Sequence, residues 1–423
     1  KHVGIKAIAQ SAAAVALLCL AGCSAGDPDR PLSEEQIQAK LKWVETVEAE
    51  DFHFWRRFAN PPPPGFRQPL EWYSPMALVS GGLSPYFEIG EADTISAAAL
   101  QVAGDYAMER ETQALIVYHQ GKIRYQRFME GFHDTSAISS HSWVKTLHGI
   151  LVGFAVADGD IASLDDPVGS YIEEWRDDPR GKITVRQVLH NTTGLESPDP
   201  RGTDPYRPAI QMIDGTDVNA VILSRPLVDP PGTSFIHNNV NTQLLGIILQ
   251  RATGKRFDHY LSEKLWRPLG AQRGALRKDT NYGNIISYCC FLSAPSDWMR
   301  VSHLLMNDGA LPDGRQLLPE GWADAMLEPS DINPNYGLHI WVGEPFNELR
   351  PYVPTMPPEY ANTHSEAFAV DDLFFFDGGG KVRIWISPKL DLIVLRMGYP
   401  PPEGMGFDEA FIPNTIIRGI DND

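Results

Sequence analysis

The sequence has few cysteines, a shortage of positive charge and no long apolar run, and each of these features excludes a class of protein. Only four cysteines occur in 423 residues, with no Cys-x-x-Cys pair and no Cys/His spacing suited to zinc, so we expect no metal site. The formal net charge of −18 disfavours nucleic acid as a partner. The run Ser11–Leu20 is too short for a membrane-spanning helix, which needs about 20 apolar residues. With 43% hydrophobic residues, the chain is an acidic protein with ample material for a large core.

The N-terminus has the layout of an export signal. Lys1 and Lys6 precede the apolar run, which ends in Leu20-Ala21-Gly22-Cys23 and resembles the bacterial lipobox. This resemblance implies cleavage before Cys23 and lipidation of its thiol. We therefore expect residues 1–22 to be a lipoprotein signal peptide. The protein would be secreted across the inner membrane and lipid-anchored in the cell envelope, on the outer membrane and facing the periplasm. The alternative is an ordinary signal peptide followed by a chance cysteine.

Two further cysteine patterns carry less weight. Cys289 and Cys290 are adjacent, and neighbouring residues rarely satisfy disulfide geometry, so we expect two small apolar core residues. Gly22-Cys23-Ser24-Ala25-Gly26 fits the Gly-x-Ser-x-Gly nucleophile elbow, but it lies within the lipobox without a strand before it or a helix after it. We reject it as a catalytic motif.

The chain is organised as a tether followed by one large domain. Residues 23–94 are expected to form the tether and an N-terminal extension, stiffened by the prolines of 61–64. Residues 95–423 are expected to form the domain, with a mostly helical subdomain at about 160–330. The pattern predicts helices over 95–110, 143–158, 240–253, 297–308 and 408–419. It predicts strands over 113–119, 122–130, 336–342, 373–376, 382–387 and 392–397.

The order of these elements indicates the fold. Strands cluster at the start and at the end of the domain, and isolated hairpins are only marginally stable, so both groups should share one sheet. Short turns, such as Gln120-Gly121, join the strands and argue for antiparallel pairing. The expected fold class is α/β (α+β): an antiparallel sheet flanked by helices, with a helical subdomain beside it.

The strongest chemical signal is Ser142-Trp143-Val144-Lys145, at the start of the central helix. Residues three apart share a helix face, so Ser142 and Lys145 can point into one site. The free N–H groups of a helix N-terminus favour an oxyanion. A desolvated lysine has a lowered pKa and, when neutral, can take the serine proton. The alternative is a helix-capping serine beside a surface lysine, because such spacings arise by chance.

Further motifs follow in a consistent order. They are Ser163–Val168 (SLDDPV), Ile183–Leu195 (ITVRQVLHNTTGL), Gln243–Gly246, Leu265–Ala271, Asn335–Leu338 and Pro413–Ile417. Together with Ser-x-x-Lys they resemble the serine β-lactamase and penicillin-binding-protein family, especially class C-like esterases and nylon-oligomer hydrolases. The resemblance covers about residues 95–420 and implies a β-lactamase/transpeptidase-like fold with three catalytic motifs. Only the first of the three, Ser-x-x-Lys, is intact here.

The second motif of the family, Tyr-x-Asn or Tyr-x-Ser, corresponds to His237-Asn238-Asn239. The resemblance implies that Asn239 holds Lys145 and a substrate carbonyl. Histidine replaces the tyrosine, and because histidine is a competent general base near neutral pH, His237 is a candidate catalytic residue. The alternative is that His237 is a loop residue and that Lys145 acts alone.

The third motif, Lys/His-Thr-Gly or a glycine-rich variant on a late strand, corresponds to Phe376–Lys381. Gly378, Gly379 and Gly380 would let the strand approach the substrate, and a backbone N–H there would complete an oxyanion hole with that of Ser142. The usual cation of this motif is absent, although Lys381 is a candidate to meet a substrate carboxylate. The alternative is a simple hairpin turn.

These motifs predict a serine hydrolase that cleaves an ester or amide through an acyl-enzyme on Ser142, without cofactor or metal. The partners would be a small-molecule ester, amide or β-lactam substrate and, through the anchor, a membrane. One alternative is a β-lactamase or a D-alanyl-D-alanine carboxypeptidase. Another is a non-catalytic cell-envelope binding lipoprotein that keeps the fold. Tyr288 and Tyr336 are aromatic residues that the sequence alone does not place relative to the site.

Overall fold

The computed structural model describes residues 52–60, 67–199, 204–353, 356, 358 and 361–420. The chain divides into two compact units. In the smaller unit the structure describes helix α3 (Phe52–Phe58) and Asp214–Thr216; the larger unit holds 62–213 and 217–423. The expected signal peptide, Cys23, and residues 24–51 and 61–66 of the expected tether and extension lie outside the described residues. No helix within the described ranges is long and apolar enough to cross a membrane.

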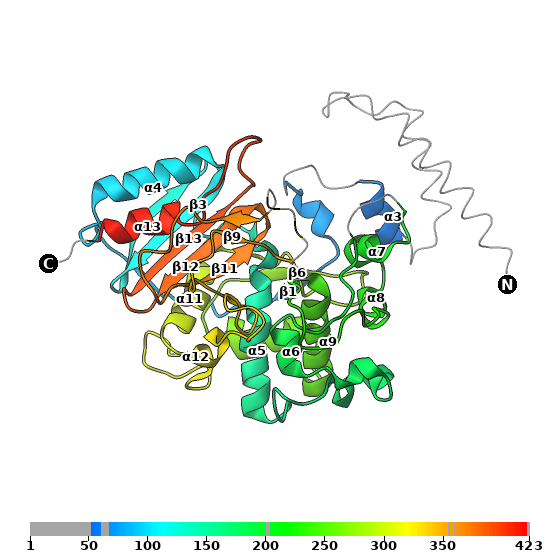
Figure 1. The fold of residues 1–423 in the computed structure, drawn as a ribbon. Helices are drawn as coiled ribbons and strands as arrows, with labels where there is room; N and C mark the ends of the chain where they lie inside the picture. The colour runs from blue at the N-terminus through cyan, green and yellow to red at the C-terminus, as the bar shows by residue number, and fades with distance from the viewer. Residues whose placement is uncertain are drawn as a thin grey trace, which may run out of the picture. The chain divides into compact units, whose positions relative to one another are not determined.

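The large unit is built on a seven-stranded sheet with the order β2-β4-β3-β13-β12-β11-β8 (Figure 1). Its strands pair antiparallel except for β2 with β4. The early strand β3 pairs with the late strand β13, so that Val117 lies opposite Val394, which confirms the prediction of one shared sheet. The strands are β2 (Glu88–Ile89), β3 (Thr112–His119), β4 (Lys122–Phe128), β8 (Trp341–Val342), β11 (Phe374–Gly378), β12 (Val382–Ser387) and β13 (Leu392–Gly398).

Helices cover both faces of this sheet, because successive strand residues point to opposite sides. Leu115 and Val117 of β3 belong to the core that includes residues of helices α4 (Ala97–Glu109) and α13 (Phe411–Arg418). Ile116, between them, belongs to the larger core with α11 (Pro295–Met306) and the remaining helices. Figure 1 shows α4 and α13 together over one face of the sheet.

Helix α5 (Val144–Asp158) is buried within the larger core. Its first twelve residues, Val144–Ala155, are all buried, and it ends at Gly159, whose φ of 83° is the left-handed conformation favoured by glycine. The prediction of a buried central helix is therefore confirmed. Helices α9 (Asn239–Thr253) and α12 (Trp322–Leu327) contact α5, and α6 (Val185–Leu189), α8 (Val218–Leu223) and α10 (Phe257–Leu261) contact α9. Helix α7 spans Pro208–Asp214.

Two features differ from the predicted pattern. Residues 160–330 also contribute the short strands β6 (Gly274–Arg277) and β7 (Leu292–Ser293). These join β1 (Met76–Val79) and β5 (Ile138–Ser139) in a four-stranded sheet that was not predicted, because two to four residues are too few to display a period of two. Of the strand predicted over 336–342, only Trp341–Val342 pairs in the large sheet, because the chain turns at His339, where φ is 60°. A separate two-stranded ribbon is formed by the short strands β9 (Leu349–Arg350) and β10 (Asn362–Thr363).

Candidate active site

Ser142 lies in a 3-10 turn, His141–Trp143, that leads directly into α5, and its side chain is partly exposed. His141 has a φ of 46°, a conformation that non-glycine residues rarely adopt. The backbone here is held on one side by Cys290, whose N–H donates to the His141 carbonyl at 3.0 Å. It is held on the other side by Trp143, whose buried indole N–H donates to the Val382 carbonyl at 3.3 Å. These contacts fix the main chain on both sides of the serine.

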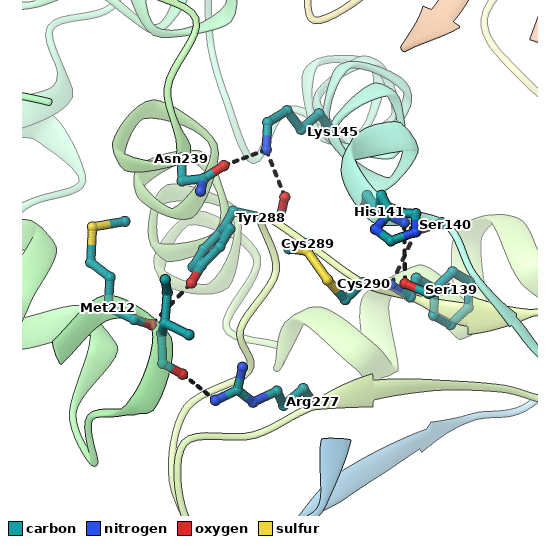
Figure 2. The surroundings of a disulfide bond; sticks show 12 residues. Ser139, Ser140, His141, Lys145, Met212, Asn239, Arg277, Tyr288, Cys289 and Cys290 are labelled. Atoms are coloured by element: carbon teal, nitrogen blue, oxygen red, sulfur yellow. Dashed lines mark hydrogen bonds between the residues drawn. A yellow bond between two sulfur atoms is a disulfide. The ribbon is translucent and has the colours of Figure 1, made fainter. Parts of the chain in front are cut away.

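Lys145, one helical turn further on, is buried, with 3% of its surface exposed. Its Nζ donates to Asn239 Oδ1 at 2.7 Å and to the carbonyl of Tyr288 at 2.7 Å (Figure 2). Burial lowers the pKa of Lys145 to about 7, although Asp377 acts in the opposite direction. A neutral amine has two N–H donors and one lone pair. Since both donors are engaged, the lone pair remains as the position that can accept a proton.

Asn239 reaches Lys145 from a second helix, because it is the first residue of α9. The Asn238 side chain caps that helix by accepting the N–H of Asn241 at 2.9 Å. Buried residues of α9 and α5 share one core. Asn239 itself is exposed, so its contact with the lysine lies at the open side of the site. The structure thus brings together Lys145 and Asn239, which the family resemblance had paired.

His237 lies on the segment before α9, half-buried among aromatic rings. Its backbone N–H donates to the Tyr352 carbonyl at 2.9 Å, and its ring stacks on that of Tyr352 with centroids 5.2 Å apart. The rings of Tyr336 and Trp341 are 5.7 and 5.5 Å away. Burial, together with the charge of Lys145, holds the pKa of His237 well below its ordinary value. Within the described part of the chain its imidazole makes no hydrogen bond to Ser142 or Lys145.

The glycine run meets the nucleophile at Gly378, the last residue of β11. A Cβ atom at this position would lie 3.2 Å from the backbone nitrogen of Ser142, so a side chain would crowd the Ser142 N–H. Gly380 and Lys381 then form a tight turn with φ values of 76° and 61°. Their carbonyls each accept a hydrogen bond from Arg396 Nη1 at 2.8 Å. The glycine run therefore forms a hairpin turn. Its first residue, Gly378, also lies beside the Ser142 N–H, where an oxyanion would form.

Lys381, the other candidate of the third motif, already has partners. Its Nζ donates to Asn362 Oδ1 at 2.6 Å and lies 3.6 Å from Glu409 Oε1. Arg383 shares the same two partners. No described contact brings Lys381 to Ser142. The cations beside the glycine turn are thus engaged with protein acceptors.

Asp377 is a component of the site that the sequence reasoning missed. It is buried on β11, forms ion pairs with Arg350 at 2.5 Å and Arg383 at 2.8 Å, and accepts the Tyr352 hydroxyl at 2.6 Å. Burial by itself would raise the pKa of Asp377, but the two guanidiniums more than offset that effect and hold it below its ordinary value. The available signal was a carboxylate directly after three phenylalanines of a buried strand, since an unpaired carboxylate is almost never buried.

Cys289 and Cys290 form a disulfide bond, which corrects the expectation of two apolar thiols (Figure 2). The chain turns at Cys290, where φ is 69°, and this turn allows adjacent side chains to meet. Both residues are half-buried, whereas Tyr288 before them and Phe291 after them are buried.

A Ser-x-x-Lys helix beside an antiparallel sheet, with an asparagine on the lysine and a glycine-rich strand on the serine, defines the β-lactamase/transpeptidase class of fold. Residues 105–282 match the model of the Beta-lactamase family. This match covers less than half of the chain and agrees with the β-lactamase and penicillin-binding-protein family that the motifs predicted.

Individual relatives agree with this placement. The chain is 25% identical to the 6-aminohexanoate-dimer hydrolase of Paenarthrobacter ureafaciens over 69% of this chain and 74% of that protein. It is 31% identical to an Escherichia coli (strain K12) protein provisionally named D-alanyl-D-alanine carboxypeptidase, over only 25% of this chain and 26% of that relative's length. A solved structure from Bacillus anthracis, provisionally named 6-aminohexanoate-dimer hydrolase, superposes with a TM-score of 0.61. Its sequence is 19% identical, and the match covers 83% of this chain and 89% of that one.

Proposed function

We propose that this protein hydrolyses an ester or amide bond through an acyl-enzyme on Ser142, with Lys145 as the proton acceptor. The observation that carries the proposal is the state of Lys145. Its amine is buried, its pKa is lowered to about 7, and both N–H donors of its neutral form are occupied by Asn239 and the Tyr288 carbonyl. A surface lysine, the alternative weighed from the sequence, would have none of these properties.

The reaction follows from these positions. Ser142 Oγ attacks the substrate carbonyl carbon while its proton passes to the lone pair of Lys145 Nζ. The backbone N–H of Ser142, which Gly378 leaves uncrowded, faces the developing oxyanion. The leaving group then takes the proton from Lys145 as its bond to the acyl carbon breaks. Water, deprotonated by the same lysine, then attacks the acyl carbon; the bond to Ser142 Oγ breaks, and Oγ recovers its proton from Lys145.

The proposed substrate does not depend on a carboxylate for recognition. Lys381 and Arg383, the cations beside the glycine turn, are paired with Asn362 and Glu409. The similarity to a protein named for hydrolysing 6-aminohexanoate dimers favours an amide within this class. The alternative, a β-lactamase or D-alanyl-D-alanine carboxypeptidase, is favoured by the similarity to the Escherichia coli protein.

The test is labelling of the purified full chain with a fluorophosphonate probe, beside assays with a short-chain p-nitrophenyl ester, its anilide and nitrocefin. We expect labelling and ester or anilide turnover that both vanish in Ser142→Ala. Turnover of nitrocefin alone would favour the β-lactamase alternative. A folded wild-type protein that neither labels nor turns over any substrate would overturn the proposal in favour of a non-catalytic binding lipoprotein.

We also propose that the protein is lipid-anchored through Cys23 in the cell envelope. The lipobox-like Leu20-Ala21-Gly22-Cys23 motivates this, and the Cys289–Cys290 disulfide supports it because disulfides persist in oxidising compartments. Expression of Cys23→Ala in a bacterial host should move the protein from the membrane fraction to the soluble fraction. A variant that stayed in the membrane fraction would contradict the anchor.

A further inference from the structure

The Cys289–Cys290 disulfide lies between the contacts that hold the two catalytic residues. Immediately before it, the carbonyl of Tyr288 accepts a hydrogen bond from Lys145 Nζ at 2.7 Å. Within it, the N–H of Cys290 donates to the carbonyl of His141, the residue before the nucleophile, at 3.0 Å. Figure 2 shows the sulfur–sulfur bond lying between these two contacts. The segment 288–290 thus contacts Lys145 at one end and the residue before Ser142 at the other.

The chain on either side of the disulfide is fixed independently. Phe291 N–H donates to Ser140 Oγ at 3.1 Å, and Ser140 N–H donates to the Phe291 carbonyl at 2.9 Å. Strands β5 and β7 continue this pairing, with Ser139 opposite Leu292. At the other end, the Tyr288 hydroxyl donates to the Met212 carbonyl at 3.0 Å. The segment is therefore anchored beyond the disulfide, and the disulfide constrains the short stretch between the anchors.

Without a constraint, the backbone conformation of this short stretch would be unfavourable. Cys290 has a φ of 69°, which costs a residue with a Cβ atom conformational energy that glycine does not experience. The ring closed by two adjacent cysteines leaves few other conformations. Without the bond, Cys290 is free to return to a negative φ, and this rotation would move both its own N–H and the peptide that follows Tyr288.

The disulfide is also within reach of solvent. Both cysteines are half-buried, while Tyr288 and Phe291 on either side are buried. Because both cysteines are partly exposed, a dithiol reductant can reach the bond. Its thiolate would attack one cysteine sulfur, and its second thiol would then displace the other member of the mixed disulfide. The products are two cysteine thiols and the oxidised, disulfide form of the reductant.

We propose that the Cys289–Cys290 disulfide is a redox-sensitive positioning element of the catalytic site: when closed it holds the Tyr288 carbonyl on Lys145 and the Cys290 N–H on His141, and reduction by a dithiol slows the acylation of Ser142. The inference rests on the proposed roles of Ser142 and Lys145. The cysteines do not touch the substrate. They act through the lysine and through the backbone that precedes the nucleophile.

The expected effect is on the pH profile as well as on the rate. Release of the Tyr288 carbonyl exposes the lysine amine to water and favours its charged form. A rise of about one pH unit in the midpoint of serine labelling corresponds to about a tenfold lower labelling rate below that midpoint. A disulfide with a purely structural role would change the stability of the protein but would leave this midpoint in place.

The test compares the full chain as purified, after reduction with dithiothreitol, and after reoxidation. The second-order rate constant for fluorophosphonate labelling is measured from pH 5 to pH 10, and iodoacetamide with mass spectrometry reports the state of Cys289 and Cys290. We expect a slower reaction and a higher midpoint in the reduced form, and recovery on reoxidation. Equal rates and midpoints in the oxidised and reduced forms would overturn the inference.

The variant Cys289→Ser/Cys290→Ser is the matched control, because it keeps the other cysteines of the chain. It should label like the reduced protein and should not respond to dithiothreitol; a response equal to that of the wild type would contradict the inference. If this variant does not fold, the reduction and reoxidation of the wild type still decide the question. Absence of labelling in every form would instead overturn the proposed function, and this inference with it.

Discussion

Lys145 Nζ and Asn239 Oδ1 lie 2.7 Å apart although they belong to two different helices, α5 and α9. The contact exists because buried residues of both helices share one core and because Asn238 caps α9 one residue earlier. Asn239 is exposed while Lys145 is buried, so the amide forms the boundary between the lysine and the solvent. The protonation of Lys145 is therefore sensitive to a change at Asn239.

Serine labelling should rise with pH through a midpoint of about 7, because burial lowers the pKa of Lys145 to about 7 and only the neutral amine accepts a proton. Below the midpoint the rate should fall about tenfold per pH unit. The fluorophosphonate labelling rate of the wild type checks this, with Lys145→Met as the control that removes the titrating group. A midpoint near that of an ordinary lysine would show that burial does not lower the pKa of Lys145.

Asn239→Asp should move that midpoint upward by about 1–3 pH units, because a carboxylate beside the amine stabilises its charged form. Asn239→Ala, which removes one acceptor and adds no charge, should lower the rate with a smaller displacement of the midpoint. Asn281→Asp, at an exposed position, controls for the added negative charge. If Asn239→Asp and Asn239→Ala gave the same midpoint, the amide would not be controlling the charge of the lysine.

Gly378→Ala should lower kcat for ester hydrolysis by about 10²–10³-fold, the effect of losing one oxyanion donor. The added Cβ atom would lie 3.2 Å from the Ser142 nitrogen and 2.6 Å from Val382 Cγ2, which blocks the approach of the oxyanion. Gly406→Ala is the matched control, because a Cβ there meets no atom within 4 Å. Equal kcat values for the two variants would remove Gly378 from the site.

His237→Phe should retain ester hydrolysis to within about tenfold, whereas loss of a general base costs about 10²–10⁴-fold. Phenylalanine preserves stacking against Tyr352 and the packing near Tyr336 and Trp341. The measurement is kcat/KM beside that of Lys145→Met. A loss as large as that of the lysine variant would instead assign His237 the role of the missing tyrosine.

Elements with a strong period were predictable from the sequence, and the contacts between elements were not. Strand 382–387 and the helix that follows Ser142 were located closely, because alternation and continuous apolarity are local signals. The turn at Gln120-Gly121 was equally local, since both residues adopt positive φ. The Lys145–Asn239 contact followed from the order of family motifs.

The parts of the site that were missed depend on tertiary structure. Arg350, on the separate strand β9, and Arg383, which lies opposite Asp377 on β12, make the burial of Asp377 possible. The pairing with Arg350 is not visible in any local pattern. The bond between Cys289 and Cys290 depends on a single backbone torsion at Cys290, which the residue type does not predict. Tyr288 contacts Lys145 through its backbone carbonyl. Because every residue has a carbonyl, the residue type does not predict this contact.

Asp377→Asn should destabilise the protein by about 3–5 kcal/mol, the usual result of removing one partner from a buried ion pair. The amide can still accept the Tyr352 hydroxyl, but Arg350 would lose this charged partner and Arg383 would keep only Glu409. Urea denaturation at neutral pH measures the difference from the wild type, and Glu366→Gln, which removes an exposed partner of Arg418, is the control expected to leave the midpoint unchanged.

The same pair of proteins gives a second readout, in pH. The folded-state pKa of Asp377 is held below its ordinary value of 3.8, so its contribution is present above that value and is lost as the pH falls through the folded-state pKa. The stability difference between wild type and Asp377→Asn should therefore be constant from pH 7 to about 5 and shrink below about pH 4. A difference that stayed constant into acid would mean that folding does not lower the pKa of Asp377, and therefore that the two guanidiniums do not stabilise its ionised form.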